Sequence, residues 1–336
     1  MNDIIKLALW NMVMYDVDKY KELEHDKGYF SLDEVGQWSY RTEILIISIK
    51  SLIPLEEKMA IKIDEKRFLN ELKLWQYYRH GSNKTLIDIA KNSNLNYWEI
   101  KDDMLPLRSL LLGIVNNNKK ELINALVVHV LETTGDIESL FKNLVVGLMT
   151  YYWILNKGNL EMDRMSSLVK EDLMILNKSQ YLLEFERHYK FKLDSYKGHF
   201  DIEFERQKIK FIGKIDGYLN GKDISDELEY LWWILKKGFV DKEVFFRKEQ
   251  IVKDEKFIDN LFEYLLKLKK GRVDPKNLKI NDYGNMDIFK FQENEIVENF
   301  LLKDSIVTKR GENKKYIKML VKSKMGNLRF FKIKNI

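Results

Sequence analysis

Histidine and cysteine, which supply many metal ligands and nucleophiles, offer little in this chain of 336 residues. Cysteine is absent, which excludes disulfides, zinc–thiolate centres and thiol nucleophiles. No histidine has metal-ligand spacing with another histidine or with a carboxylate on one predicted face, so we expect all of them to be surface or core residues. The histidines are His25, His80, His129, His188 and His199. Carboxylates and basic residues remain as the candidates for chemistry.

Two segments in the first fifty residues combine acidic and polar side chains next to apolar helices. Residues 15–19 read YDVDK and follow an apolar stripe of helical spacing over residues 3–14. Residues 36–42 read GQWSYRT, and a strongly apolar stretch then runs to Ile53 and stops at Pro54.

Four further segments follow in order. Residues 103–113 read DMLPLRSLLLG, and residues 133–136 read TTGD, in which Asp136 is a natural N-cap for a long helix. A leucine- and tryptophan-rich stretch covers Leu228–Leu235. Residues 252–257 read VKDEKF and open a predicted helix that ends near Gly271.

In order and spacing, these six segments resemble the motifs of the ADP-ribosylglycohydrolase family, which includes the dinitrogenase reductase activating glycohydrolase. The resemblance covers residues 1–275 and implies an all-helical bundle with a central cleft, where the family binds two divalent cations, usually magnesium. Residues 36–42 correspond to the family's Gly-x-Trp-Thr-Asp-Asp-Thr motif, and residues 252–257 to its Gly-Gly-Asp-x-Asp-Thr motif.

The chain departs from the family at the metal ligands. Tyr40 and Arg41 stand where the motif has two carboxylates, and Lys256 stands at the second aspartate of the last motif. Of five matching ligand positions, only Ser39 and Asp254 could still coordinate magnesium, which requires oxygen ligands. We therefore expect that the magnesium site is lost, that no cofactor is bound, and that metal-assisted hydrolysis by the family mechanism is not available.

Two cations in this position suggest a binding role. Arg41 and Lys256 could replace the positive charge of the metals, with Asp16 or Asp254 as counter-ions, so that the cleft still attracts an ADP-ribose-type ligand. We accordingly expect Arg41 within salt-bridge distance of Asp254 or Asp16. The alternative is a closed cleft with a buried ion pair. The expected cleft residues are Asp16, Trp38, Ser39, Tyr40, Arg41, Thr42, Asp103, Arg108, Asp254 and Lys256.

The leading hypothesis is thus a catalytically inactive protein that binds an ADP-ribose-type ligand or a protein partner. A hydrolase with a rearranged site is the first alternative, and its available carboxylates are Asp16, Asp18, Glu22, Glu43, Asp102, Asp103 and Asp254. Nucleic-acid binding is the second, because residues 276–336 contain 14 Lys and Arg against 7 Asp and Glu. A helical protein unrelated to the family remains the third.

The elements that must position these residues are predicted to be mainly helical. Few breakers, with 3 prolines and 16 glycines, favour long helices, and β-forming residues concentrate in the tail. We expect an ADP-ribosylglycohydrolase-like helical domain over residues 1–275 and a basic antiparallel β extension over residues 285–336. No apolar run is long enough for a membrane span and no signal-peptide pattern opens the chain, so we expect a cytoplasmic protein.

Individual elements follow from hydrophobic periodicity and turn residues. The predicted helices cover residues 42–53, 66–78, 84–91, 104–115, 119–131, 137–155, two stretches within 160–192, 225–237, 241–250 and 254–270. Residues 200–216 fit either a helix or a charged hairpin. The predicted strands cover residues 287–291, 299–309, 315–322 and 327–334.

Overall fold

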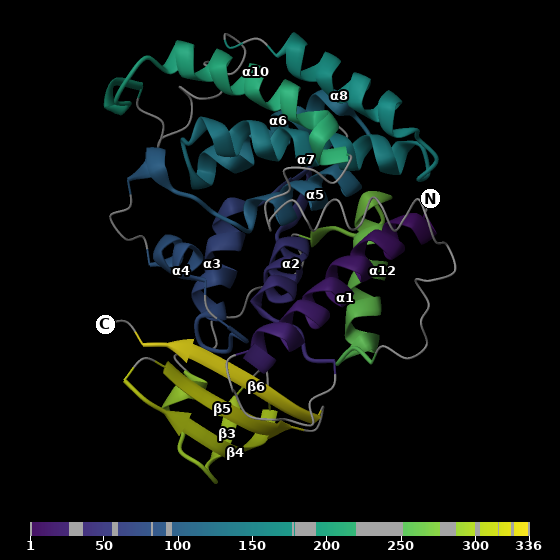
Figure 1. Ribbon diagram of the computed structural model, residues 1–336. Coiled ribbons are helices and arrows are strands. Elements are labelled where there is room, and N and C mark those ends of the chain that lie inside the picture. The colour runs from purple at the N-terminus through teal and green to yellow at the C-terminus, as the bar shows by residue number, and fades with distance from the viewer. Residues whose placement is uncertain are drawn as a thin grey trace.

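The protein is built from a body of helices with a small sheet at one end (Figure 1). The computed structural model describes residues 2–26, 36–55, 60–81, 83–91, 96–176, 178, 193–219, 251–275, 287–299, 303–314, 316–323 and 326–334. The helices are α1 (Asn2–Asp26), α2 (Tyr40–Lys50), α3 (Glu65–Trp75), α4 (Lys84–Ala90), α5 (Leu105–Val115), α6 (Lys119–Thr133), α7 (Ile137–Leu155), α8 (Met162–Ile175), α10 (Phe200–Leu219) and α12 (Glu255–Lys269). The mainly helical class predicted from the sequence is confirmed.

Helices α5, α6 and α7 form the centre of the body, with α8 and α10 on one side and α1, α2 and α12 on the other (Figure 1). Two glycines permit their close approach. A Cβ atom at Gly113 would lie 2.5 Å from the carbonyl oxygen of Gly147, and one at Gly147 would lie 2.4 Å from Leu126 Cδ1. Consequently α7 is buried along almost its whole length.

Hydrophobic periodicity and capping residues predicted the bounds of these helices closely. The structure begins and ends α5, α6 and α7 within two residues of the predicted bounds. Asp136 caps α7 as expected, because its side chain accepts a hydrogen bond of 2.8 Å from Ser139 N–H. The open choice at residues 200–216 is settled in favour of a helix, α10.

The expectation that residues 1–275 contain essentially no sheet is wrong. Strand β1 (Leu52–Leu55) pairs antiparallel with β2 (Ala60–Ile63). Helix α2 ends at Lys50 because Ser51 caps it, its N–H donating to Ile47 O at 3.1 Å, and Pro54 has no N–H with which to continue a helix. The side chain of Asn116 fastens the hairpin to the body by bonding both the N–H and the carbonyl oxygen of Ile61, at 2.9 Å each.

The predicted C-terminal sheet is confirmed, with two changes. Strands β3 (Ile296–Asn299), β4 (Lys303–Glu312), β5 (Tyr316–Ser323) and β6 (Gly326–Ile333) form an antiparallel sheet in sequence order. The first predicted strand is instead a 3-10 helix, η6 (Ile288–Lys290), because Asp287 accepts a hydrogen bond from Phe289 N–H and so favours a turn. The second predicted strand, at 299–309, corresponds to β4, and β3 precedes it as a strand that was not predicted.

Buried hydrophobic side chains form two clusters, one in the helical body and one between η6 and the sheet. Tyr78 packs against both clusters and so joins the two parts. The division at residues 275 and 285 remains a prediction. Among the described helices, none combines the length and apolar character needed to cross a membrane. The predicted helices at 225–237 and 241–250, the later part of 160–192, and the motif at Leu228–Leu235 lie outside the described residues.

Candidate functional site

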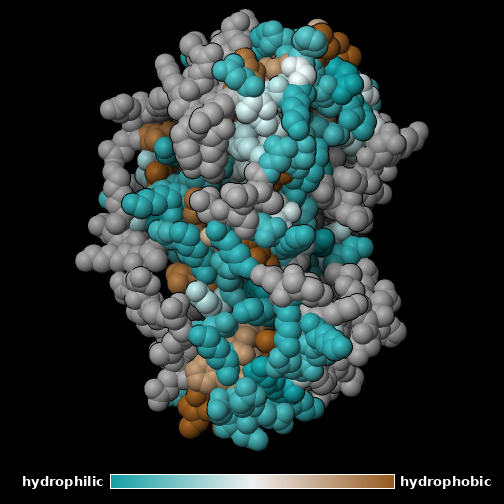
Figure 2. Space-filling view, turned by 90° about the vertical axis from the view of Figure 1, so that its left-hand side faces the viewer, coloured by the Kyte–Doolittle hydropathy of each residue, from teal (hydrophilic) through white to brown (hydrophobic). Residues whose placement is uncertain are grey.

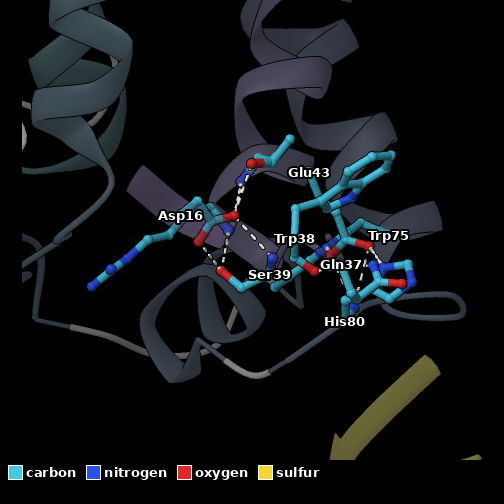
Figure 3. Close-up of polar contacts among 9 residues, drawn as sticks. Asp16, Gln37, Trp38, Ser39, Glu43, Trp75 and His80 are labelled. Atoms are coloured by element: carbon cyan, nitrogen blue, oxygen red, sulfur yellow. Dashed lines mark hydrogen bonds and ion pairs between the residues drawn. The ribbon is translucent and has the colours of Figure 1, made fainter. Parts of the chain in front are cut away.

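The N-terminus of α2 is built around the carboxylate of Asp16, which reaches it from α1 (Figure 3). Asp16 Oδ2 accepts hydrogen bonds from Ser39 N–H (2.9 Å), Thr42 N–H (3.1 Å) and Thr42 Oγ1 (2.7 Å), and Oδ1 accepts one from Ser39 Oγ. Three of these bonds go to Oδ2 and one goes to Oδ1, so the carboxylate serves mainly the first turn of α2. Burial raises the pKa of Asp16, while its bonds to Ser39 and Thr42 oppose the rise. Asp16 is therefore a structural cap for α2.

A second acid lies beside the first turn of α2. Asp103 Oδ1 accepts a hydrogen bond of 2.6 Å from Asn83 Nδ2, and Oδ2 lies 3.5 Å from the hydroxyl of Tyr40. Burial raises the pKa of Asp103, and the nearby positive charge of Arg41 lowers it. Burial also raises the pKa of Tyr40, and the Asp103 carboxylate adds to that rise. We call Tyr40, Arg41, Asn83 and Asp103 the polar cluster.

The segment before α12 lies against the segment before α2. Lys253 N–H donates to Gly36 O at 2.9 Å, and a Cβ atom at Gly36 would lie 2.2 Å from Ile251 O. Asp254 follows with a left-handed backbone, φ 55°, and its side chain does not cap α12. Burial raises the pKa of Asp254, and the charges of Lys253 and His80 oppose the rise. A half-buried acid on a strained backbone is a frequent feature of functional sites.

Asp254→Asn is expected to stabilise the protein at pH 7, by less than about 1 kcal/mol because the side chain is only half-buried. A raised pKa means that the folded state holds the proton more tightly than the unfolded state. The stability that this contributes is present below the usual pKa of 3.8 and is lost as the pH rises through the folded-state value. Asparagine stays neutral and tolerates a left-handed backbone.

Thermal melts at pH 7 and pH 4 measure this effect, and the gain should shrink at pH 4. Asp201→Asn is the matched control, because Asp201 is an exposed acid on α10 and its replacement should bring no gain. An Asp254→Asn protein that melts below the wild type at pH 7 would contradict the assignment of Asp254 as a destabilising acid.

Arg108 does not line a cleft, contrary to the sequence-based expectation. Its side chain is fully buried, and its Nη2 lies 2.6 Å from Asp102 Oδ2. Its Nε donates to His129 Nε2 at 2.8 Å, and its guanidinium lies over the ring of Phe68, 4.9 Å from the centroid. Burial and the Arg108 charge lower the pKa of His129 well below its usual value. The apolar residues around Arg108 in sequence, PLRSLLL, were the available signal for its burial.

The other expected cleft residues divide by exposure. Trp38 and Thr42 are buried, like Asp16 and Ser39, and so shape the site without reaching a ligand. Lys256 lies on the exposed face of α12. The expected ion pair of Arg41 with Asp16 or Asp254 stays a prediction, and the positive charge of Arg41 lowers the pKa of Asp16. The Asp16 oxygens accept hydrogen bonds from Ser39 and Thr42, and the charges that lower the pKa of Asp254 are those of Lys253 and His80.

One buried pair was not predicted from the sequence. Glu43, one turn into α2, accepts hydrogen bonds from Trp75 Nε1 (2.8 Å) and His80 N–H (3.0 Å), and its Oε1 contacts His80 Nδ1 (Figure 3). The imidazole of His80 is itself buried, 6% exposed, and its Nε2 has no hydrogen-bond partner. These partners lie 32 and 37 residues from Glu43, and no local pattern marks such a contact.

The site therefore combines one cation, Arg41, with hydroxyl, amide and carboxylate groups that can bond a polar ligand. In the described part of the chain, no group of three or more histidine or acidic side chains could hold a metal ion. The loss of the magnesium site stays a prediction. No family model and no curated protein matches this sequence.

Proposed function

We propose that this protein is a catalytically inactive relative of the ADP-ribosylglycohydrolases, and that it binds an ADP-ribose-type ligand at the polar cluster. One observation carries the proposal. Segments that resemble four of the family's motifs, far apart in sequence, meet around the first turn of α2, through Asp16 with Ser39, Tyr40 with Asp103, and Gly36 with Lys253. Chance resemblances would have no reason to converge on one place.

The chemistry of the cluster supports a ligand that carries both phosphate and hydroxyl groups. A guanidinium binds phosphate oxygens through parallel charge-assisted hydrogen bonds, which makes Arg41 the group for the phosphates. Asp103 is suited to a ribose hydroxyl, because its carboxylate accepts hydrogen bonds and the bond from Asn83 holds it in place. Asp16 accepts four hydrogen bonds from Ser39 and Thr42, so its carboxylate is engaged within the protein, which supports binding without a metal ion.

ADP-ribose is expected to bind equally well with magnesium and with a chelator, as measured by titration calorimetry. Arg41→Gln should weaken binding by about ten-fold or more, because a hydrogen bond to a charged group contributes roughly 1.5–3 kcal/mol. Arg164→Gln, on the exposed face of α8, is the matched control and should bind as the wild type does. Binding that requires magnesium, or no binding at all, would overturn the proposal.

A hydrolase with a rearranged site is the enzyme alternative. Its support is that burial raises the pKa of both Asp103 and Asp254, which suits a general acid. Two of its other carboxylates already have partners: Asp102 pairs with Arg108, and Glu43 bonds Trp75 and His80. The wild type would then release ADP-ribose from a modified peptide, and Asp103→Asn would abolish that release. This result would favour the enzyme.

A protein partner or a nucleic acid would use other surfaces. The view in Figure 2 is mostly hydrophilic, with small separate hydrophobic patches. Among the residues that the structure describes, the most exposed large apolar side chains lie on α8 and α10, and they are Met174, Ile175, Ile202 and Ile209. In the tail, Arg310 and Lys334 pair with Glu312, and Lys332 pairs with Asp287, which leaves fewer cations for nucleic acid.

A further inference from the structure

One short stretch of chain contacts both the C-terminal sheet and the polar cluster. It consists of Arg79, His80, Gly81 and Asn83, between α3 and α4, and we call it the connector. Figure 1 shows β6 as the strand of the sheet nearest to the helices. A displacement of the connector should therefore affect both the C-terminal sheet and the polar cluster.

The sheet side of the connector contacts β6 through backbone and ring. Phe331 N–H donates to Arg79 O at 3.2 Å, and His80 forms an isolated parallel bridge with Phe331. The ring of His80 lies 4.8 Å from that of Phe330, centroid to centroid. Sheet and connector are thus joined by a hydrogen bond and by aromatic packing.

The body side of the connector contacts the first turns of α2. His80 is held by Glu43, which belongs to the same helix as Tyr40 and Arg41. A Cβ atom at Gly81 would lie 3.0 Å from Tyr40 Cδ1, so the connector backbone supports the tyrosine ring directly. Asn83 then donates to Asp103. Three of the four residues of the connector therefore touch the site or the helix that carries it.

Electrostatic interactions also link the C-terminal sheet with the helical body. Arg79 lies in the field of Glu43 on α2 and of Asp287 at the start of η6. Burial lowers the pKa of Arg79 to about 10, while the two carboxylates oppose the fall and help to keep the guanidinium charged. One buried cation is thereby shared by an acid of the body and an acid of the tail.

We propose that docking of the C-terminal sheet on the connector controls the polar cluster, so that ligand binding at the cluster and docking of the sheet stabilise each other. The ligand half of this inference rests on the proposed function. The structural half, in which the sheet orders the first turn of α2, does not. Coupling between sites is reciprocal, so each half predicts an effect at the other end of the connector.

Phe330→Leu tests the structural half without any ligand. It removes the ring next to His80 and leaves an apolar side chain in the sheet core. Hydrogen exchange of the amides at 40–44, 103–105 and 107–108 should become at least about five-fold faster, a factor at the lower end of usual coupling between sites. Phe289→Leu is the matched control, because Phe289 is equally buried in the sheet core and its ring contacts Lys332 rather than His80. It should leave these amides unchanged.

Glu43→Gln tests the same coupling from the helical body, because Glu43 lies on α2 and outside the sheet core. It should accelerate exchange in β6, which Glu43 does not touch, by a similar factor. Unchanged exchange in β6 with Glu43→Gln, or in α2 with a folded Phe330→Leu protein, overturns the coupling whether or not ADP-ribose binds.

ADP-ribose titration then tests the ligand half. Phe330→Leu should bind the ligand at least about five-fold more weakly than Phe289→Leu does, and the ligand should slow exchange in β6 of the wild type. If exchange responds to the substitutions but wild type binds no ADP-ribose, the proposed function fails and the coupling stands. If ligand binds and both phenylalanine variants keep wild-type affinity, control of the cluster by the sheet is overturned.

Discussion

Asp102→Ala is expected to destabilise the protein by about 3–5 kcal/mol, because it leaves the fully buried guanidinium of Arg108 without its carboxylate partner. Neither side chain of this pair is exposed to solvent, so water cannot compensate for the lost charge. His129 cannot replace the acid, since it already accepts from Arg108 Nε and is itself buried. The same substitution also removes the acceptor for Met104 N–H.

Chemical denaturation of the purified variant measures this loss. Asp201→Ala is the matched control, because Asp201 pairs with Lys178 at the surface, where its side chain is 65% exposed. Such exposed pairs contribute roughly 0–1 kcal/mol. If Asp102→Ala cost no more than Asp201→Ala, Arg108 would have to be reaching solvent, and its burial in the core would be wrong.

Gly36→Ala is expected to cost about 2–5 kcal/mol, from two separate penalties. Gly36 has φ +87°, where an L-residue loses roughly 1–2 kcal/mol. The added Cβ would also lie 2.2 Å from Ile251 O, a backbone atom that cannot rotate away, and overpacking of this kind costs about 1–3 kcal/mol. The predicted loss applies to the junction that brings Asp254 towards α2.

Gly213→Ala provides a control of opposite sign. Gly213 lies inside α10, and a Cβ there would meet nothing within 4 Å. Alanine in a helix interior is more stable than glycine by roughly 0.5–1 kcal/mol, so this variant should melt slightly higher than wild type. A Gly36→Ala protein with the stability of the wild type would show that segments 36–38 and 251–253 are not held together as described.

The sequence predicted those parts of the fold that depend on neighbouring residues. Helices α5 to α7 were located because their apolar character is strong and because Asn118 and Asp136 mark the starts of α6 and α7. The hairpin β1–β2 was missed because a run of Ile and Leu fits a buried helix as well as a strand, and only Ser51 and Pro54 decide between them.

The site was predictable where a motif joined distant residues and unpredictable elsewhere. The proximity of Asp16 and Ser39 was expected from their matching motif positions, and the ion pair of Arg41 stays a prediction. The contact of Glu43 with His80 depends on how the chain after α3 turns back on α2, and nothing at either residue encodes that turn. Tertiary contacts between polar side chains are set by the whole packing arrangement.

The connector has a further consequence, for self-association. A sheet in sequence order has two open edges, at β3 and at β6, and unpaired backbone groups on an edge invite pairing with other chains. The β3 edge is only four residues long, and the β6 edge is partly occupied by Arg79 and His80. The helical body thus covers part of the β6 edge and limits its pairing with other chains. A tail fragment without that body would present the eight residues of β6 as a template for strand addition, and it should aggregate where the intact chain does not.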